Sequence, residues 1–280
     1  MDKALAGQRA LVTAGASGIG RGICEALAAR GVRVVVADIE GDRADAVAQA
    51  IRTSGGEARG LTLDVIDPDA WSALAELADS LWDQPVSLLF NNAGVGAGGL
   101  VHTTPRRTWD WIFSVNVIGP YNGVTTFAPR MLAHGLPSVI INTGSEHALG
   151  LPPTGRGGIL APYTAAKHAV MGYSLCMRRD FAGSNIAGGI VCPGLVQSDI
   201  WNAFRNRQPE FGGPRQAPEA FGESNAKGLS WQVAGQRIVE QVEAGSFFIF
   251  TNGPDEAEVL EDFTSEATAA MAAFRARYDG

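Results

Sequence analysis

The stretch that decides the fold is Arg9–Gly20, which reads RALVTAGASGIG. Its first part, RALVT, is a short apolar run typical of a buried strand, and the rest is a turn rich in glycine. A helical pattern follows and ends at Gly31. Strand, turn and helix make the first half of a βαβ unit, in which the backbone of the turn can approach a phosphate at the helix N-terminus.

The segment 32–38 continues this unit. It reads VRVVVAD, which is typical of a strand buried on both faces of a parallel sheet. The strand ends in Asp38, 18 residues beyond Gly20, where the ribose-binding acid of a dinucleotide site is expected. A carboxylate there accepts ribose hydroxyls and repels a 2′-phosphate. The pattern therefore favours NAD over NADP, although Arg21 and Arg43 are close in sequence.

Strands and helices alternate along the rest of the chain. Helices are predicted over 41–54, 67–82 and 104–134 and from Tyr163, and strands over 58–64, 86–90, 138–142, 189–192 and 247–250. This alternation predicts an α/β fold with a doubly wound parallel sheet of about seven strands, a Rossmann fold, in a single domain over 1–280. Ligands of such sheets bind at the carboxyl ends of the strands.

Two segments fall outside this alternation. The segment 198–227 carries three prolines among aromatic residues, and we expect a substrate lid or a cover for the sheet edge. The segment 254–280 is expected to be a C-terminal helical tail that packs on its own domain or on a neighbouring subunit.

Composition excludes several classes of protein. A net charge of −7 argues against nucleic acid as a partner. No apolar run is long enough for a membrane span, and polar residues interrupt the N-terminus before a signal peptide could form. The three cysteines lack metal-type spacing, and no metal site is expected. These features favour a reduced, cytoplasmic protein.

Tyr163 and Lys167 lie four residues apart at the start of a predicted helix, so their side chains share one helical face. A neighbouring cation favours the phenolate and is expected to lower the pKa of Tyr163 from its usual value near ~10. A phenol tuned in this way can exchange a proton with an alcohol or a carbonyl oxygen.

Several motifs in a fixed order make the chain similar to the short-chain dehydrogenase/reductase family. They are the turn at 13–20, NNAG at 91–94, Ser145, Tyr163 with Lys167, and PGLVQS at 193–198. The resemblance implies cofactor-binding roles for Gly15, Ser17, Gly18, Ile19, Gly20, Asp38, Asp64, Val65, Asn92, Ala93, Gly94, Tyr163, Lys167, Pro193, Gly194, Val196 and Ser198. Among these, Asp64 and Val65 would hold the adenine. Pro193, Gly194 and Val196 would contact the nicotinamide end, and Ser198 its carboxamide.

The resemblance also implies the chemistry. Tyr163 would be the general acid/base, Lys167 would lower its pKa and bind the nicotinamide ribose, Ser145 would orient the reacting oxygen, and Asn116 would hold a relay water. The expected activity is an NAD-dependent alcohol dehydrogenase or carbonyl reductase for a hydrophobic secondary alcohol or ketone. A homotetramer or homodimer is expected.

Two departures from the family pattern stand out. Ala14 occupies the place of the usual first glycine, and we expect it to be tolerated because alanine adds one methyl group. Ser145 and Tyr163 are 18 residues apart, several more than usual, and the extra residues in 151–158 are expected to form a loop at the substrate mouth.

Rival functions remain open. An NAD-binding regulator would have lost the catalytic residues, and a lyase or dehalogenase on this fold would not need the glycine-rich turn or Asp38. A hydrolase using Ser145 and His147 is disfavoured because neighbours on an extended segment face opposite ways. His147 is expected to line the pocket or a loop.

Overall fold

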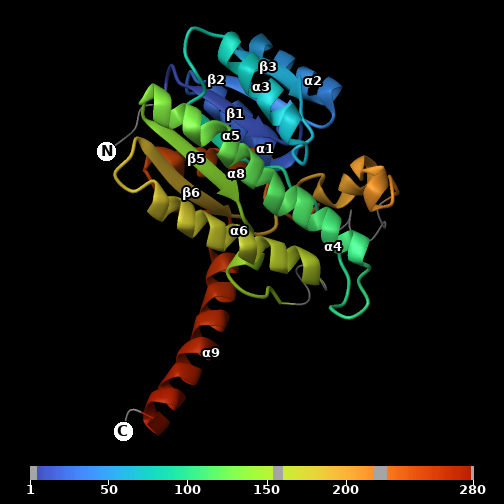
Figure 1. The fold of residues 1–280 in the computed structure, drawn as a ribbon, viewed down its shortest axis with the longest axis vertical. Coiled ribbons are helices and arrows are strands. Elements are labelled where there is room, and N and C mark those ends of the chain that lie inside the picture. Colours follow the sequence, from blue (N-terminus) through green and yellow to red (C-terminus); the bar gives the residue numbers. More distant parts are fainter. Residues whose placement is uncertain (1–4, 154–159, 217–225, 279–280) are drawn as a thin grey trace.

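The computed structural model describes residues 5–153, 160–216 and 226–278. Its centre is one parallel sheet with the strand order β3-β2-β1-β4-β5-β6-β7 (Figure 1). The strands are β1 (Arg9–Thr13), β2 (Arg33–Asp38), β3 (Ala58–Thr62), β4 (Leu88–Asn91), β5 (Ser138–Thr143), β6 (Ile186–Cys192) and β7 (Phe248–Phe250). The order reverses between β1 and β4, and the doubly wound fold expected from the sequence is confirmed.

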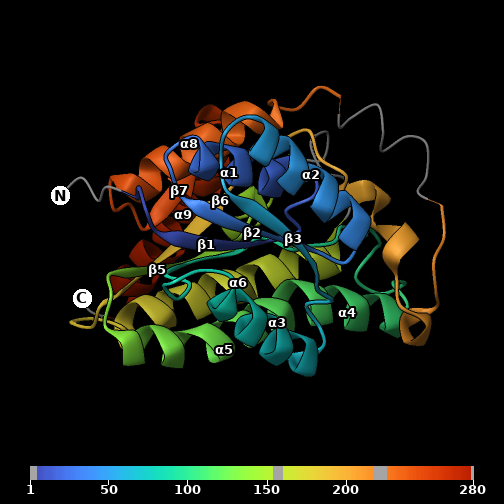
Figure 2. The ribbon, with the colours of Figure 1, turned by 90° about the horizontal axis from the view of Figure 1, so that it is seen from above.

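Helices cover both faces of the sheet, as Figure 2 shows. One face carries α1 (Gly18–Ala28), α2 (Gly41–Thr53) and α8 (Trp231–Glu243), and the other carries α3 (Pro68–Ser80), α5 (Gly119–His134) and α6 (Ala161–Asp180). The strands are apolar on both faces because both faces are covered. Each face has its own core, one around Leu11 and Trp71 and the other around Val12 and Ile23.

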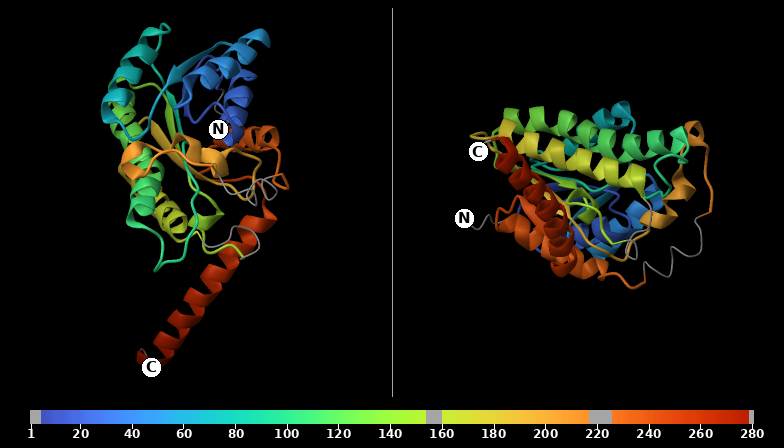
Figure 3. Two further views of the ribbon diagram at one scale, coloured as in Figure 1. Left: turned by 90° about the vertical axis from the view of Figure 1, so that its right-hand side faces the viewer. Right: turned by 90° about the horizontal axis from the view of Figure 1, so that it is seen from below.

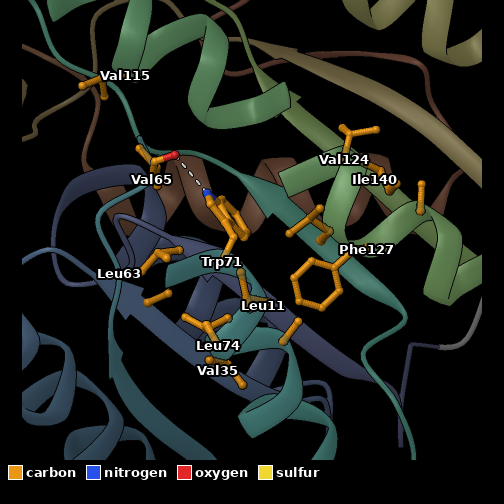
Figure 4. Packing of buried hydrophobic residues seen from close by; sticks show 14 of the residues in the cluster. Leu11, Val35, Leu63, Val65, Trp71, Leu74, Val115, Val124, Phe127 and Ile140 are labelled. Carbon is orange, nitrogen blue, oxygen red and sulfur yellow. Dashed lines mark hydrogen bonds between the residues drawn. The ribbon is translucent and has the colours of Figure 1, made fainter. Parts of the chain in front are cut away.

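The start of α3 shows how sequence sets local structure. The Asp67 carboxylate accepts hydrogen bonds from the backbone N–H groups of Asp69 at 2.9 Å and Ala70 at 3.2 Å, while Pro68 opens the helix. This cap directs Trp71 into the core, where its indole N–H donates to the Val65 carbonyl at 2.9 Å and its ring meets Phe127 edge-on (Figure 4). The bond fixes Val65, which lies at the carboxyl end of the sheet.

The long helix expected over 104–134 is not continuous. It comprises α4 (Arg106–Phe113), a π-helical turn η1 (Ser114–Ile118) and α5. Asn116, in the π-helical turn, bonds the backbone of Val95 through both atoms of its amide, at 2.8 and 3.0 Å. Single π turns inside helices are frequent at functional sites, and here the turn brings Asn116 to the segment after β4.

Two elements extend from the layered body. After β6 the chain forms the short 3₁₀ helices η3 (Ile200–Asn206) and η4 (Pro209–Phe211), and the C-terminal segment forms α9 (Pro254–Tyr278). A further 3₁₀ turn, η2 (Glu146–Ala148), lies between β5 and α6. Figure 3 shows α9 projecting away from the sheet and its helices. Of the expected lid at 198–227, residues 217–225 lie outside the described part of the chain, as do 154–159 of the expected mouth loop. No helix among the described residues is long and apolar enough to cross a membrane.

Replacing Trp71 by alanine should lower the free energy of unfolding by about 3–5 kcal/mol, because it leaves a large cavity and frees the Val65 carbonyl. Leu77→Ala is the matched control on the same helix, since Leu77 is 46% exposed and its truncation should cost less than about 0.5 kcal/mol. Guanidinium denaturation of the three proteins measures both values. Equal losses in the two variants would contradict this account of the α3 core.

Candidate active site

The carboxyl ends of the strands open into a cavity of about 1450 Å³, including its open mouth. Its wall includes residues of the glycine-rich turn and Asp38 as well as Tyr163 and Lys167. Most of the residues singled out in the sequence line it, namely Ser17, Gly18, Ile19, Asp38, Asp64, Val65, Asn92, Ala93, Gly94, Ser145, Tyr163, Lys167, Pro193, Gly194, Val196 and Ser198. Gly15, Gly20 and Asn116 are not on its wall.

Polar side chains join three strand ends beneath the cavity. The Thr13 hydroxyl oxygen accepts the backbone N–H groups of Asn92 and Ala93, both at 2.9 Å. The Asn92 side chain donates to the Thr13 carbonyl at 3.1 Å, and the Thr143 hydroxyl donates to Asn92 Oδ1 at 3.4 Å. The ends of β1, β4 and β5 are therefore held in one fixed arrangement.

The glycines of the turn have different tasks. A Cβ at Gly20 would lie 2.1 Å from the Ala14 carbonyl oxygen, so only glycine allows α1 to start this close to β1. Gly18 has φ +50° and would place a Cβ 2.7 Å from that of Ser198 across the cavity. Ala14 itself adopts φ +49°, in the left-handed region. An alanine at this position therefore costs conformational energy because of its positive φ, and not because of the volume of its methyl group.

Asp38 lies at the tip of β2 and faces the turn. Its carboxylate accepts hydrogen bonds from the backbone N–H groups of Ala16 at 3.1 Å and Glu40 at 3.0 Å. The side chain is 8% exposed, and this burial raises the pKa of its carboxyl above the ordinary value. Both carboxylate oxygens can accept further hydrogen bonds.

The segment after β6 is tied to the cavity wall near Asp38. Gln208 donates to Asp64 Oδ2 at 2.8 Å, and Arg205 forms an ion pair with Glu40. On the same side, Arg43 pairs with Glu40 at 2.8 Å and with Asp199 at 2.7 Å. Apart from the local pair of Arg43 with Glu40, these contacts join residues more than a hundred positions apart, so spacing along the sequence could not reveal them.

The ion pairs account for both arginines that follow the turn. Arg43 is engaged by Glu40 and Asp199, and Arg21 pairs with Glu25 at 2.8 Å while its guanidinium lies 4.6 Å from the centre of the Trp231 ring. Both guanidinium groups therefore already have partners with which a 2′-phosphate would have to compete.

Tyr163 and Lys167 both face the cavity from α6. Lys167 Nζ donates to the Thr143 carbonyl at 2.8 Å and lies 5.5 Å from the centre of the Tyr163 ring. Burial lowers the pKa of Lys167 to about 8, and burial raises the pKa of Tyr163 to about 12 despite its hydrogen bond with Ser145. The sequence predicts a lowered phenol pKa, whereas in the protein by itself the pKa of Tyr163 is raised, because burial of the phenolate outweighs its hydrogen bond with Ser145.

Ser145 reaches Tyr163 in spite of the long separation in sequence. It caps η2, where its hydroxyl oxygen accepts the His147 N–H at 3.2 Å, and its side chain hydrogen-bonds Tyr163. The segment after Ser145 is a 3₁₀ turn and not the extended chain assumed above, so Glu146 and His147 both line the cavity. The prediction that Ser145 and His147 face opposite ways on an extended segment is therefore wrong.

His147 nevertheless has a different partner. Its Nδ1 lies 2.8 Å from Thr164 Oγ1, and its ring meets Tyr163 edge-on with centroids 5.4 Å apart. Burial lowers the pKa of His147 to about 4, so the ring is neutral at pH 7. Leu195 and Trp201 also line the cavity.

Asn116 and Gly94 complete the arrangement. A Cβ at Gly94 would lie 3.4 Å from Asn116 Oδ1 and 3.5 Å from Lys167 Nζ, so the glycine backbone separates the two side chains at contact distance. The amide of Asn116 is already bonded to Val95 and is 1% exposed. Its side chain therefore positions the chain beside Lys167.

The loop after β6 is held by a residue that the sequence patterns did not indicate. Glu256, in the first turn of α9, is buried, and its Oε1 accepts the N–H groups of Gly194 at 3.1 Å, Thr251 at 3.1 Å and Asn252 at 2.9 Å. A buried carboxylate that accepts several backbone N–H groups fixes their positions. Gly194, on the cavity wall, is thereby tied to the C-terminal helix.

A metal site finds no support in the described parts of the chain. Among these residues, no group of three or more His, Cys, Asp or Glu side chains is placed to hold an ion. The cavity instead offers a glycine-lined turn at a helix N-terminus, an acid at the end of the second strand, and Ser145, Tyr163 and Lys167 at its far end. This set of groups fits a dinucleotide along the cavity with an oxygen of a second molecule at Tyr163.

Comparison with known proteins agrees with this geometry. The sequence model of the family described as "short chain dehydrogenase" matches residues 8–209. The C alpha-dehydrogenase of Sphingobium sp. (strain NBRC 103272 / SYK-6) is 32% identical over 206 residues, which are 73% of this chain and 66% of that protein. The 1-deoxy-11-beta-hydroxypentalenate dehydrogenase of Streptomyces exfoliatus is 28% identical over 91% of this chain and 86% of that enzyme.

A solved structure is similar over almost the whole chain. The crystal structure of a short chain dehydrogenase/reductase from Burkholderia phymatum in complex with NAD superposes with a TM-score of 0.82 at 31% identity. The match covers 91% of this chain and 92% of that one.

Ala14→Gly should raise the free energy of unfolding by about 0.5–1 kcal/mol. Glycine adopts a positive φ without the steric penalty that alanine has there, and this gain is larger than the entropic cost of ordering a glycine on folding. Ala29→Gly is the control, since Ala29 has φ −63° at the end of α1 and should lose up to about 1 kcal/mol. Denaturant titration gives both changes. A loss of stability in Ala14→Gly would show that the left-handed conformation carries no penalty.

His147 should make the stability depend on pH. Its pKa is about 4 in the folded protein and about 6.5 when unfolded, so between these values the unfolded chain binds more protons. The stabilisation is complete above pH ~6.5 and falls as the pH drops towards ~4, by at most ~3 kcal/mol in total. Urea titrations at several pH values should show a shallower decline in His147→Asn. Parallel curves for the two proteins would contradict the buried, neutral histidine.

Proposed function

The chain belongs to the short-chain dehydrogenase/reductase family, and we propose that it is an NAD-dependent oxidoreductase acting on a hydrophobic secondary alcohol or its ketone. The observation that carries the proposal is the meeting of Ser145, Tyr163 and Lys167 at the end of one cavity whose other end is bounded by Asp38 and the glycine-rich turn. A pocket that merely senses a nucleotide has no need for a hydroxyl, a phenol and an ammonium group around a second molecule. The oxidoreductase assignment itself follows from the family.

The proposed proton chemistry depends on three residues of this chain. A bound NAD in its oxidised form would supply the hydride acceptor for the substrate carbon, and its positive charge would favour the phenolate of Tyr163. Tyr163 takes the proton from the substrate hydroxyl, and Ser145, which already hydrogen-bonds Tyr163, orients the same substrate oxygen. Lys167 is held against the Thr143 carbonyl and supplies the ammonium group for the nicotinamide ribose.

The role proposed for Asn116 differs from the one that the sequence predicts. Each polar atom of its amide makes a hydrogen bond with the Val95 backbone, and the residue is 1% exposed, so the side chain is poorly placed to hold a relay water. We infer that the main chain of the π-helical turn would hold that water, with the Asn116 side chain fixing the turn. Protons then pass from Tyr163 through Lys167 towards solvent.

The preference for NAD over NADP rests on charge at the ribose end. The Asp38 carboxylate is held by two backbone N–H groups, with Glu40 beside it. A 2′-phosphate would meet these acids, while Arg43 is engaged by Glu40 and Asp199. The NAD in the Burkholderia phymatum structure supports a nicotinamide cofactor here.

The proposed substrate class follows from the wall of the cavity near Tyr163. Val95, Leu160, Leu195 and Trp201 line it, and a Cβ at Gly96 would lie 3.0 Å from the Trp201 ring. This wall favours an apolar group next to the reacting carbon. Phe204 and Leu149 are not on this wall: the Phe204 ring lies tilted against that of Trp111, and Leu149 packs in a core cluster with Val259.

Assembly into a homotetramer or homodimer is also proposed. Ile118, Tyr121 and Leu132 lie along the η1–α5 helix and are 47%, 49% and 47% exposed. Exposed apolar side chains along one helix are typical of a surface between subunits.

The test is NAD-linked absorbance at 340 nm with a panel of apolar secondary alcohols and ketones, run with NAD and NADP. Wild type should turn over with NAD and far less with NADP, and Tyr163→Phe should lose at least about 100-fold in kcat because the proton acceptor is gone. Tyr173→Phe is the control, a tyrosine on the same helix that does not line the cavity. NAD binding without turnover in any panel member would favour a sensing protein, and absence of NAD binding would overturn the proposal.

A further inference from the structure

The C-terminal helix α9 is held by the domain at its base. Glu256 and Val259 are buried, and a Cβ at Gly150 would lie 2.8 Å from the Val259 carbonyl oxygen. Phe263 makes an edge contact with His168, with ring centroids 6.4 Å apart. All residues from Leu260 to Tyr278 are exposed, and the helix leads away from the sheet (Figures 1 and 3). Its direction is therefore fixed while most of its length is uncovered.

The uncovered part carries one apolar stripe. Its members recur at spacings of three and four residues, which places them on one helical face, and they are Leu260, Phe263, Ala267, Met271, Phe274 and Tyr278. The five large side chains among them are 41–63% exposed. A stripe this narrow is the seam of a pair of helices, whereas a helix lying on a globular core has a wider apolar face.

The stripe has the same pattern from either end. With a second α9 placed antiparallel about a two-fold axis at residue 269, Leu260 lies opposite Tyr278 and Ala267 opposite Met271, and Phe263 lies within one residue of the level of Phe274. The four large side chains of the two outer levels thus meet large ones, and an alanine meets the flexible Met271 near the centre. This self-complementary order is what a two-fold interface requires.

The distribution of charge along α9 distinguishes an antiparallel pair of helices from a parallel pair. The first half carries Glu258, Glu261, Asp262 and Glu266, and the last turn carries Arg275 and Arg277. In the antiparallel register Glu261 and Asp262 lie at the level of residues 275–277 of the other helix, which include Arg275 and Arg277. A parallel pair would instead place acidic residues against acidic residues along its first half.

We propose that α9 is an interface with a second copy of this chain, formed by two antiparallel α9 helices along the stripe from Leu260 to Tyr278. The helix has 25 residues, about 37 Å, so pairing along the stripe would place the two domains towards opposite ends of the pair. This interface is separate from the surface of α5 and adds to any assembly made there. Because Glu256 ties α9 to Gly194, pairing would also steady the loop on the cavity wall.

The first experiment measures mass by light scattering after gel filtration of the full-length protein. Met271→Glu with Phe274→Glu should halve the mass of the assembly, because charges then replace the centre of the stripe. Ala269→Glu with Ala276→Glu, on the opposite face, adds the same charge and should leave the mass unchanged. Circular dichroism checks that both variants fold. Equal masses for the two variants would overturn the proposal.

The second experiment tests the direction of pairing in a Cys176→Ser background, since Cys176 is an exposed thiol. Phe263→Cys combined with Phe274→Cys should give covalent dimers with a short bismaleimide, and each single variant should give far fewer. Efficient linking by the single variants would indicate parallel helices and overturn the proposal. A halved mass without linking in the double variant would place α9 on another surface and would equally overturn it.

Discussion

Thr13, the last residue of β1, makes the contacts on which the site depends. Its hydroxyl oxygen and carbonyl hold the backbone and side chain of Asn92, and Asn92 in turn accepts the hydroxyl of Thr143. The glycine-rich turn begins directly after Thr13, and the Lys167 ammonium is held by the Thr143 carbonyl. A few hydrogen bonds thus set the distance between the cofactor end and the reacting end of the cavity. Parallel strands make this possible because their carboxyl ends meet at one edge.

Burial has opposite consequences for the two central titratable groups. It disfavours the phenolate of Tyr163 and raises the pKa of that group to about 12, while it disfavours the ammonium of Lys167 and lowers its pKa to about 8. A proton therefore leaves Lys167 more easily than it leaves Tyr163 in the protein by itself. In the proposed reaction, the positive charge of the oxidised cofactor is what would bring the phenol into a useful range. Such an arrangement links proton transfer to cofactor binding.

The cavity is closed by segments that lie late in the sequence. Asp199, Arg205 and Gln208 fasten the chain after β6 to Arg43, Glu40 and Asp64, at the end that would hold adenosine. At the opposite end, Glu256 anchors Gly194 and starts α9. Residues 199–208 of the segment expected to be a substrate lid are thus fastened at the end that would hold adenosine. The Glu256 carboxylate is buried, where such bonds are stronger than on an open surface, whereas the side chains of Arg43 and Asp199 are 40% and 44% exposed.

The alternation of strands and helices, the glycine-rich turn, the position of Asp38 at the end of a strand, and the shared helical face of Tyr163 and Lys167 could all be predicted from the sequence. These signals are local, because they consist of period, spacing and residue type within about twenty positions. The sequence did not determine the break in the long helix at Asn116, the 3₁₀ turn that brings His147 into the cavity, or the direction of the Tyr163 pKa shift. Each of these depends on contacts between distant segments and on burial. The exposed stripe of α9 shows the same division. The periodicity of the stripe can be read from the sequence. That the domain leaves the stripe uncovered follows from the tertiary structure, since the first turns of α9 are fixed in a direction that leads away from the core.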